Sequence, residues 1–232
     1  MARLPRLVVP NLPHHVIQTG NDSQLIFREP DDYPRFLGWL KDSAREFKVA
    51  IHAYVLMPDH VHLLASPSTE QGLAQMMQRV GRYYVPWYNA KYSRSGSLFQ
   101  GRFKTSLIDA QRYFMVCSRY IESNPVRSQL VADPRDYPWS SFAHHAGLCS
   151  DPVITDHALY WALGNTPFQR EAAYIELSQP LSAAEKATVD AAVLKGWPLG
   201  SDAFKTELQQ RAKRQVLPAK RGRPFKVKPA VE

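Results

Sequence analysis

The chain has 232 residues and a mass of 26.4 kDa, the size of one large or two small domains, and is long enough to bury a core. Apolar residues make up 44% and aromatic residues 11%, which excludes disorder over most of the length. The longest nearly apolar run, Val49 to Met57, is too short to cross a bilayer, and two cysteines are too few for a disulfide framework. Because the N-terminal residues also lack the apolar run of a secretory signal, we expect a soluble, cytoplasmic protein.

The net charge of +8 is distributed unevenly along the chain. Residues 79–127 and residues 211–232 each carry a net charge of +7, whereas residues 1–78 carry −1 and residues 128–210 carry −5. Separate basic blocks are typical of a protein that binds a polyanion, because each Lys or Arg that neutralises a phosphate releases condensed counterions. The charge pattern therefore predicts a nucleic-acid partner, and the lack of a long apolar run predicts no membrane partner.

The first half of the chain alternates predicted strands and helices. Residues 12–20 contain β-branched positions before a Gly-Asn-Asp turn, which predicts a strand. Apolar residues at spacings of three and four predict a helix over residues 33–47. Two strands, at residues 49–57 and 60–66, then follow and are joined by a tight Pro-Asp turn.

Further elements complete a recognisable order. A helix is predicted from near Gly72 to about residues 92–96, a strand over residues 98–108, and a third helix over residues 111–123. Pro125 stops this helix, because the residue before a proline is pushed out of the α region. The order predicts an α+β fold: a ferredoxin-like split βαβ antiparallel sheet with helices on one face.

Three segments differ in composition. Residues 1–147 form the predicted core domain, and residues 148–210 are alanine-rich, with prolines that divide short helices. Residues 211–232 combine basic residues with prolines and have little apolar surface to bury, so we expect a disordered basic tail.

The sequence His60-Val61-His62 places two imidazoles on one predicted strand. Alternate residues of a strand share a face, so these side chains project together, about 7 Å apart at the α-carbons, while Val61 points into the opposite layer. Two histidines in this arrangement can hold a metal ion. The alternative is a pair of surface histidines on a half-exposed strand.

The predicted third helix places a tyrosine and an amide on one stripe. At 100° per residue, Tyr113, Tyr120 and Asn124 lie close together around the helix axis, whereas Glu122 faces away from Tyr120. A helical tyrosine is usually a core or rim residue, and Asn124 sits directly before a proline.

Together, the histidine pair and the tyrosine predict phosphodiester cleavage by a phenol. A free phenol has a pKa near 10, so only about one in a thousand is ionised at neutral pH and the reaction needs help. A divalent ion can polarise the phosphate, and basic neighbours such as Lys104, Arg112 and Arg119 add electrostatic stabilisation. Attack by tyrosine leaves one DNA end attached to the protein, which conserves bond energy for rejoining.

Five ordered blocks of the sequence resemble the single-tyrosine, His-hydrophobic-His transposase superfamily, and most closely its REP-associated tyrosine transposases. The likeness covers about residues 12–147. The blocks are HVIQTGNDSQLIF (15–27), IHAYVLMPDHVHLLASP (51–67), SGSLFQGRFKTSLI (95–108), SRYIESNPVRSQLV (118–131) and YPWSSFAHHAG (137–147).

The resemblance implies roles for individual residues. His60 and His62 match the metal-binding pair, Tyr120 matches the nucleophile, and Asn124 matches the polar residue that completes the metal site. The implied activity is cleavage of single-stranded DNA beside a small hairpin, with a 5′-phosphotyrosine, a free 3′-hydroxyl and Mg²⁺ or Mn²⁺. Related insertion-sequence enzymes are dimers that share active sites, whereas the REP-associated branch is thought to act alone, so we expect a monomer.

Other basic residues are expected to contact DNA. Arg79 and Arg82 alternate with Tyr83, Tyr84, Trp87 and Tyr88, which can stack bases, although such a helix more often packs against its own sheet. Arg102 belongs to the first basic block. Arg221 and Arg223 lie in an Arg-Gly-Arg-Pro sequence similar to an AT-hook core, and nonspecific phosphate contact is the favoured interpretation there.

Two rival functions remain at this stage. A DNA-binding or regulatory protein that holds repetitive hairpins without cutting them predicts that Tyr120→Phe leaves every activity intact. A metal hydrolase that activates water predicts cleavage without a covalent adduct.

Overall fold

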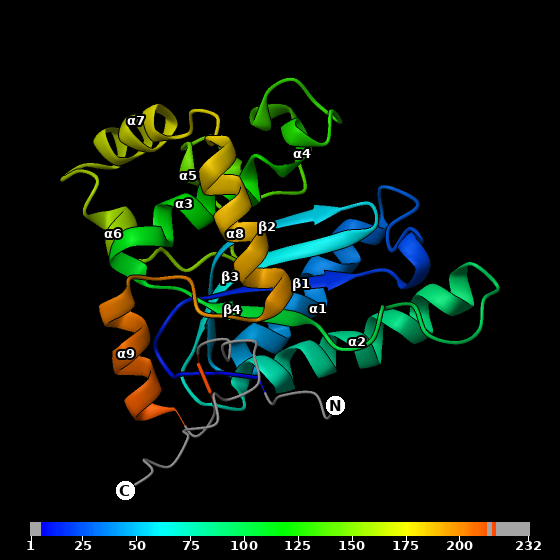
Figure 1. The fold of residues 1–232 in the computed structure, drawn as a ribbon. Coiled ribbons are helices and arrows are strands. Elements are labelled where there is room, and N and C mark those ends of the chain that lie inside the picture. The colour runs from blue at the N-terminus through cyan, green and yellow to red at the C-terminus, as the bar shows by residue number, and fades with distance from the viewer. Residues whose placement is uncertain (1–5, 213–214, 217–232) are drawn as a thin grey trace, which may run out of the picture.

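The computed structural model describes residues 6–212, 215 and 216. Its centre is a four-stranded antiparallel sheet in the order β2-β3-β1-β4 (Figure 1). This is the order of a ferredoxin-like split βαβ sheet, so the predicted α+β fold is confirmed. The strands are β1 (His14–Thr19), β2 (Val49–Met57), β3 (His60–Pro67) and β4 (Lys104–Leu107).

The pairing register brings residues far apart in the sequence together. Strand β1 lies between β3 and β4, with Thr19 opposite His60 and Ile17 opposite His62. His15 is opposite Leu64 and is therefore a diagonal neighbour of His62 on the same face of the sheet. Pro58 and Asp59 form the turn between β2 and β3, as the sequence predicts.

Two helices cover one face of the sheet. Helices α1 (Asp32–Glu46) and α2 (Gly72–Lys91) pack against each other and bury the apolar residues that point to this side of the strands, including Val16, Val61 and Leu63. Both helices were predicted: α1 matches its predicted range to within one residue, and α2 ends at Lys91, just before the predicted end at residues 92–96. The prediction that helices cover only one face is wrong, because the third predicted helix and a helix from the C-terminal segment cover the other face.

The opposite face of the sheet is covered as well. Helices α3 (Ala110–Glu122) and α8 (Ala183–Lys195) pack over it, and Figure 1 shows α8 crossing the strands. Strand residues that alternate with the first set, such as Val55 and Leu64, are buried beneath α3 and α8. The sheet therefore has two buried faces, and the histidines of β3 point toward the α3 side.

One predicted strand is shorter than expected. Regular pairing of the predicted strand 98–108 is confined to β4, Lys104–Leu107. Gly101 has φ +63°, in the left-handed region that interrupts an extended chain, and Phe99 makes only an isolated bridge to Gly20. The residues before β4 form a loop that is held to the end of β1 by the bond from Gln100 N to Thr19 O, 2.8 Å.

Short helices connect and follow the core. Thr166 and Ser182 each cap a helix with a capping box, and Pro167 occupies the first turn of α7, where a proline costs no hydrogen bond. The helices of this part are α4 (Asn124–Arg127), α5 (Phe142–His145), α6 (Ala158–Trp161), α7 (Pro167–Leu177) and α9 (Asp202–Arg211).

The basic tail lies almost entirely outside the described residues. Helix α9 continues to Arg211, and Val216 is buried with Leu7, Leu107 and Leu208. These two residues, Arg211 and Val216, depart from the expectation of a disordered tail over residues 211–232. Most of that tail, including Arg221 and Arg223, lies outside the described residues, and there the expectation stays a prediction. Among the described helices, none is both long and apolar enough to span a membrane.

Asp32 connects the two helices on the first face. Its buried carboxylate accepts hydrogen bonds from Lys91 Nζ at 2.8 Å and from Tyr92 OH at 2.8 Å, at the end of α2. It also accepts the backbone N–H groups of Arg28 and Glu29. Burial alone raises the pKa of Asp32, but these donors outweigh it and hold the pKa below its ordinary value.

Asp32→Asn is expected to lower the free energy of unfolding by about 2 to 3 kcal/mol at neutral pH, because it removes charge-assisted bonds from a buried site. This difference in the free energy of unfolding is fully present above the pKa that Asp32 has in the unfolded chain. It disappears as the pH falls through the lower pKa that Asp32 has in the folded protein. Urea denaturation at several pH values measures it. Asp31→Asn, at the exposed neighbouring carboxyl, is the matched control, and an equal loss in both variants would contradict the assignment.

Candidate active site

His60 and His62 lie on the α3 side of β3, two residues apart. Their ring centroids are 5.0 Å apart, in an edge-to-face arrangement. Val61 is 1% exposed and packs into the opposite layer, as predicted. His62 is buried and His60 is half-buried, so the pair lies at the rim of the core rather than on an open surface.

Asp59 determines the tautomer of His60. The distance from His60 Nδ1 to Asp59 Oδ1 is 2.6 Å, and the hydrogen bond from His60 holds the pKa of this carboxyl below its ordinary value. Because Nδ1–H donates to the carboxylate, Nε2 carries the free lone pair. The amide nitrogen of Asn124 lies 2.9 Å from this Nε2, so β3 and α4 meet at the imidazole.

His15 plays the corresponding part for His62. Its Nε2 lies 2.8 Å from His62 Nδ1. Burial lowers the pKa of His15 to about 3 and, with the neighbouring histidines, holds the pKa of His62 well below its usual value. Both rings are therefore neutral at physiological pH, the form in which imidazole binds metals.

Only one tautomer of this pair leaves His62 able to bind a metal. His62 Nδ1–H must donate to His15 Nε2, so that His62 Nε2 keeps its lone pair. His15 Nδ1 then carries the other proton, and this buried atom has no hydrogen-bond partner among the described residues. The strand therefore presents the same ring atom, Nε2, from both His60 and His62.

Tyr120 brings its ring against this histidine cluster. The centroid of its ring lies 5.7 Å from that of His62 and 5.6 Å from that of His15, in edge-to-face contacts. The residue is 6% exposed. Burial, followed by the hydrogen bond to Asp190, raises the pKa of the Tyr120 phenol, although Arg127 opposes the shift. At neutral pH the phenol is therefore protonated.

Charged groups surround the phenol. Its hydroxyl donates a hydrogen bond to Asp190 Oδ1 on α8, and Lys186 Nζ lies 2.7 Å from the other oxygen of this carboxylate. The Arg127 guanidinium lies 4.2 Å from the centre of the Tyr120 ring and donates to the Tyr120 carbonyl at 2.6 Å. Two cations and one anion thus surround the tyrosine.

Glu122 anchors α3 on its other side. Its carboxylate accepts hydrogen bonds from Ser141, from His145 Nδ1 at 2.7 Å and from Tyr174 at 2.5 Å, and it is 1% exposed. The sequence prediction that Glu122 faces away from Tyr120 is confirmed. Because a buried charge is costly without its partners, this network limits how far α3 can rotate or slide.

The donor set suits a divalent ion with one adjustment. The described residues contain no group of three or more His, Cys, Asp or Glu side chains placed to hold a metal, so the ligands would be His60, His62 and Asn124. The Asn124 amide presents its nitrogen to His60, and a flip of this amide presents its oxygen instead. Two imidazole nitrogens and one amide oxygen bind divalent ions but do not select Mg²⁺ or Mn²⁺ over other metals.

The predicted DNA-contacting residues are spread over several elements. Arg112 and Arg119 lie on α3, whereas Arg102 and Lys104 lie in and after the loop before β4. Arg119 donates to Gln179 O at 2.6 Å. Arg79 and Arg82 lie on α2, across the sheet from Tyr120, and Arg79 pairs with Glu46. The structure therefore does not gather these cations around the candidate site.

The aromatic residues of α2 are mainly structural. Tyr84 and Tyr88 are fully buried and donate to the carbonyls of Ile26 and Leu25 at 2.5 and 2.6 Å. Only Tyr83 and Trp87 reach the surface, next to Trp39 of α1.

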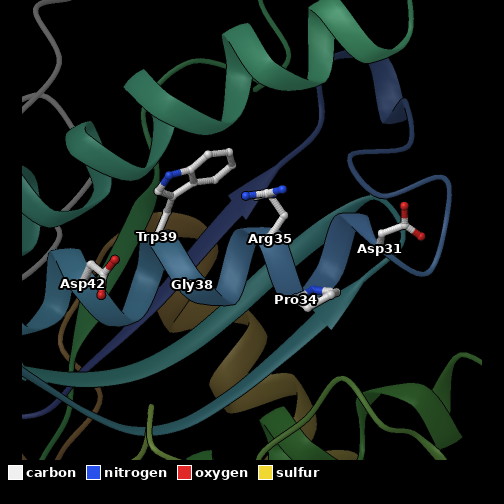
Figure 2. A pocket seen from close by; sticks show the side chains of 6 residues that line it. All are labelled: Asp31, Pro34, Arg35, Gly38, Trp39 and Asp42. Atoms are coloured by element: carbon white, nitrogen blue, oxygen red, sulfur yellow. The ribbon is translucent and has the colours of Figure 1, made fainter.

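A hollow of about 420 Å³ lies along α1. Figure 2 shows Trp39 and Arg35 pointing from α1 toward α2, with Gly38 between them on the helix. The other lining residues are Asp31, Pro34 and Asp42. None of the candidate active-site residues lines this hollow, which belongs to the other layer of the fold.

Five residues of the candidate site had no predicted role there: His15, Asp59, Arg127, Lys186 and Asp190. Asp59 was predicted only as part of the turn before β3. Arg127 is seven residues after Tyr120, a spacing that returns to the same face of a helix. We did not predict this neighbour because we expected the helix to end before Pro125, whereas helical structure continues as α4 to Arg127. The antiparallel pairing of β1 with β3 places His15 next to His62, so His15 could be found only once the register of these strands was known. No local pattern points to Asp190, which is 70 residues away in sequence.

Comparison with known proteins agrees with this architecture. The model of the family described as "Transposase IS200 like" matches residues 8–124, half of the chain. A solved structure of a REP-associated tyrosine transposase bound to a REP hairpin superposes with a TM-score of 0.52 at 16% identity, covering 68% of this chain and 92% of its own, and shares the fold. A putative transposase from Deinococcus radiodurans R1 is 20% identical, with a TM-score of 0.35 and coverage of 52% and 96%. No curated protein matches the chain. The chain belongs to the IS200-like transposase family.

Proposed function

We propose that this protein is a metal-dependent endonuclease and strand transferase that cleaves single-stranded DNA beside hairpins of repetitive palindromic elements, in the cytoplasm. Tyr120 is the nucleophile, and His60, His62 and Asn124 hold the divalent ion. The observation that carries the proposal is the edge contact between the Tyr120 ring and the paired imidazoles, 5.7 Å from His62, within one chain. Membership in a transposase family supports the same conclusion.

In the proposed reaction, the 5′-phosphate of one DNA segment is transferred from the 3′-oxygen of its neighbour to the tyrosine oxygen. The Tyr120 oxygen attacks phosphorus, the bond to the 3′-oxygen breaks, and a 5′-phosphotyrosine and a 3′-hydroxyl result. A bound Mg²⁺ or Mn²⁺ supplies charge stabilisation at the phosphate. Asp59 and His15 orient the imidazoles, while Arg127 places a positive charge beside the attacking group.

A hairpin partner fits the fold and the charge distribution. The REP-associated transposase that shares this fold was solved with a REP hairpin. On this chain, Arg102, Lys104, Arg112 and Arg119 are the proposed contacts on the sheet and α3 side. Arg79 and Arg82 on α2 are proposed for a more distant stretch of nucleic acid, and Arg221 and Arg223 for nonspecific phosphate contact.

The proposed active unit is a monomer. Tyr120 and the histidines contact one another inside a single chain, so a second copy need not contribute a residue to the site. No small-molecule substrate is proposed.

Tyr120→Phe is expected to abolish covalent attachment, lowering it at least about 1,000-fold, because the attacking oxygen is absent. The measurement incubates the protein with labelled single-stranded hairpin DNA and Mn²⁺ and looks for a protein–DNA band that survives denaturation. Tyr113→Phe, on the same helix, is the matched control and keeps the band.

Two other outcomes of this assay identify the rival functions. Cleavage without a covalent band in the wild type indicates a metal hydrolase that uses water. Hairpin binding that is equal in wild type and Tyr120→Phe, with no cleavage in either, indicates a DNA-binding or regulatory protein.

Asp59→Asn is expected to weaken Mn²⁺ binding about 10- to 100-fold, because the carboxylate that orients His60 is lost. Electron paramagnetic resonance of free Mn²⁺, titrated with protein in the absence of DNA, measures this directly. Asp22→Asn, at an exposed loop position with φ 48° that Asn tolerates, is the control. Unchanged affinity in Asp59→Asn would argue against His60 as a ligand.

Deletion of residues 217–232 is expected to weaken hairpin binding, because five basic residues are removed. The slope of log association constant against log salt concentration is expected to become less steep by up to about 3.5. This deletion keeps Val216, which is buried in the described structure. Fluorescence anisotropy over a range of salt concentrations provides the slope. A slope unaffected by the deletion removes the tail from the DNA interface.

A further inference from the structure

Helix α8 carries a carboxylate to the candidate nucleophile from outside the segment that the family model matches. That match ends at residue 124, whereas α8 spans Ala183–Lys195. Val189 and Ala192 of α8 are buried against the same cluster as Tyr120. Asp190, on the next position of the helix, reaches the phenol.

Both ends of α8 are fixed, so the position of Asp190 is set by the fold. Ser182 and Glu185 form a capping box at its start. At its end, Ser106 Oγ of β4 donates to Trp197 O at 2.6 Å. Leu199 then pairs with the end of β4 and the residues that follow it. Its N–H donates to Leu107 O, and its carbonyl accepts from Asp109 N, both at 2.8 Å.

The two oxygens of the Asp190 carboxylate have different partners. Oδ1 accepts the hydrogen bond from the Tyr120 hydroxyl, and Oδ2 accepts one from Lys186, one turn earlier on α8. The side chain is 30% exposed. Partial burial raises the pKa of Asp190, but the bonds from Lys186 and Tyr120 outweigh it and hold the pKa below its ordinary value. The carboxylate is therefore ionised and aimed at the phenol.

Other groups near the phenol are unsuited to accept its proton. Arg127 has only donors. His15 and His62 are occupied with each other through Nε2 and Nδ1, and His62 Nε2 is the proposed metal ligand. A carboxylate that accepts the proton of an attacking hydroxyl is an established arrangement in phosphoryl transfer.

We propose that Asp190 is a catalytic residue, the proton acceptor for Tyr120, supplied by the C-terminal helical segment. The inference rests on the proposed function and deepens it. As the bond from the Tyr120 oxygen to phosphorus forms and the bond from phosphorus to the 3′-oxygen breaks, the phenol proton moves to Asp190 Oδ1. The leaving 3′-oxygen takes a proton from water. In strand rejoining the 3′-hydroxyl attacks, its proton passes to water, and Asp190 returns a proton to the departing tyrosine oxygen.

The direct test compares Asp190→Asn with wild type in the full chain. The amide keeps the shape of the side chain but is a far weaker proton acceptor. The rate of covalent adduct formation in a single turnover, at saturating Mn²⁺ and hairpin DNA, is expected to fall about 100- to 10,000-fold. Hairpin affinity is expected to change little. The unfolding temperature is expected to fall only slightly, because the ion pair with Lys186 that is lost lies at the surface and the amide oxygen can still accept the bond from Tyr120.

Chemical rescue separates proton transfer from a structural role. Asp190→Ala leaves space beside the phenol, and added formate is expected to restore its rate at least about tenfold over the unrescued variant. The matched control is Glu176→Gln, which removes an exposed carboxylate from α7 and keeps the wild-type rate with or without formate.

Each outcome decides the matter. A wild-type rate in Asp190→Asn overturns the inference, and a faster rate shows instead that the bond to Asp190 holds the phenol back. A slow Asp190→Ala that formate does not rescue assigns Asp190 a structural role. A wild-type protein that forms no adduct removes the proposed function and this inference together, whereas an adduct in wild type with an unaffected Asp190→Asn removes the inference alone.

Discussion

The candidate site depends on the packing of one tyrosine ring against two imidazoles of the sheet. Tyr120 is the point at which α3 meets β1 and β3, because its ring contacts both His15 and His62. An apolar contact of this kind fixes the distance between helix and strand. The atoms that carry the proposed chemistry, the phenol oxygen and the imidazole nitrogens, lie at the edge of the rings that make the contact.

Electrostatics at the site follow from burial. Desolvation favours the neutral form of each buried ring, so His15 and His62 are available as lone-pair donors and Tyr120 keeps its proton. The charged groups next to these rings are Asp59 in the turn before β3, Arg127 after α3, and the pair Asp190 and Lys186 on α8. This arrangement surrounds the neutral rings with charged side chains, and the Arg127 guanidinium is held by the Tyr120 carbonyl and the Ser123 hydroxyl.

The C-terminal helical segment is part of the core architecture rather than an appendage. Helix α8 covers the face of the sheet that α1 and α2 leave open, and its exit is bonded to the end of β4. Tyr174 of α7 also donates to Glu122 of α3. Removing this segment would expose the apolar residues beneath α8 and leave the charge on Glu122 with fewer partners.

The sequence by itself determined the order of elements and the main residues of the candidate site. Alternation along a strand was enough to place His60 and His62 on one face, and helical periodicity was enough to separate Tyr120 from Glu122, because both are properties of a single element. Gly101 limited the strand predicted over residues 98–108, since one left-handed residue interrupts the pairing. Only the tertiary structure decided that His15, Arg127 and Asp190 surround the tyrosine. His15 depends on the register between β1 and β3, Arg127 on a helix that resumes after Pro125, and Asp190 on the path of α8. These are contacts between elements, and no periodicity within one element encodes them.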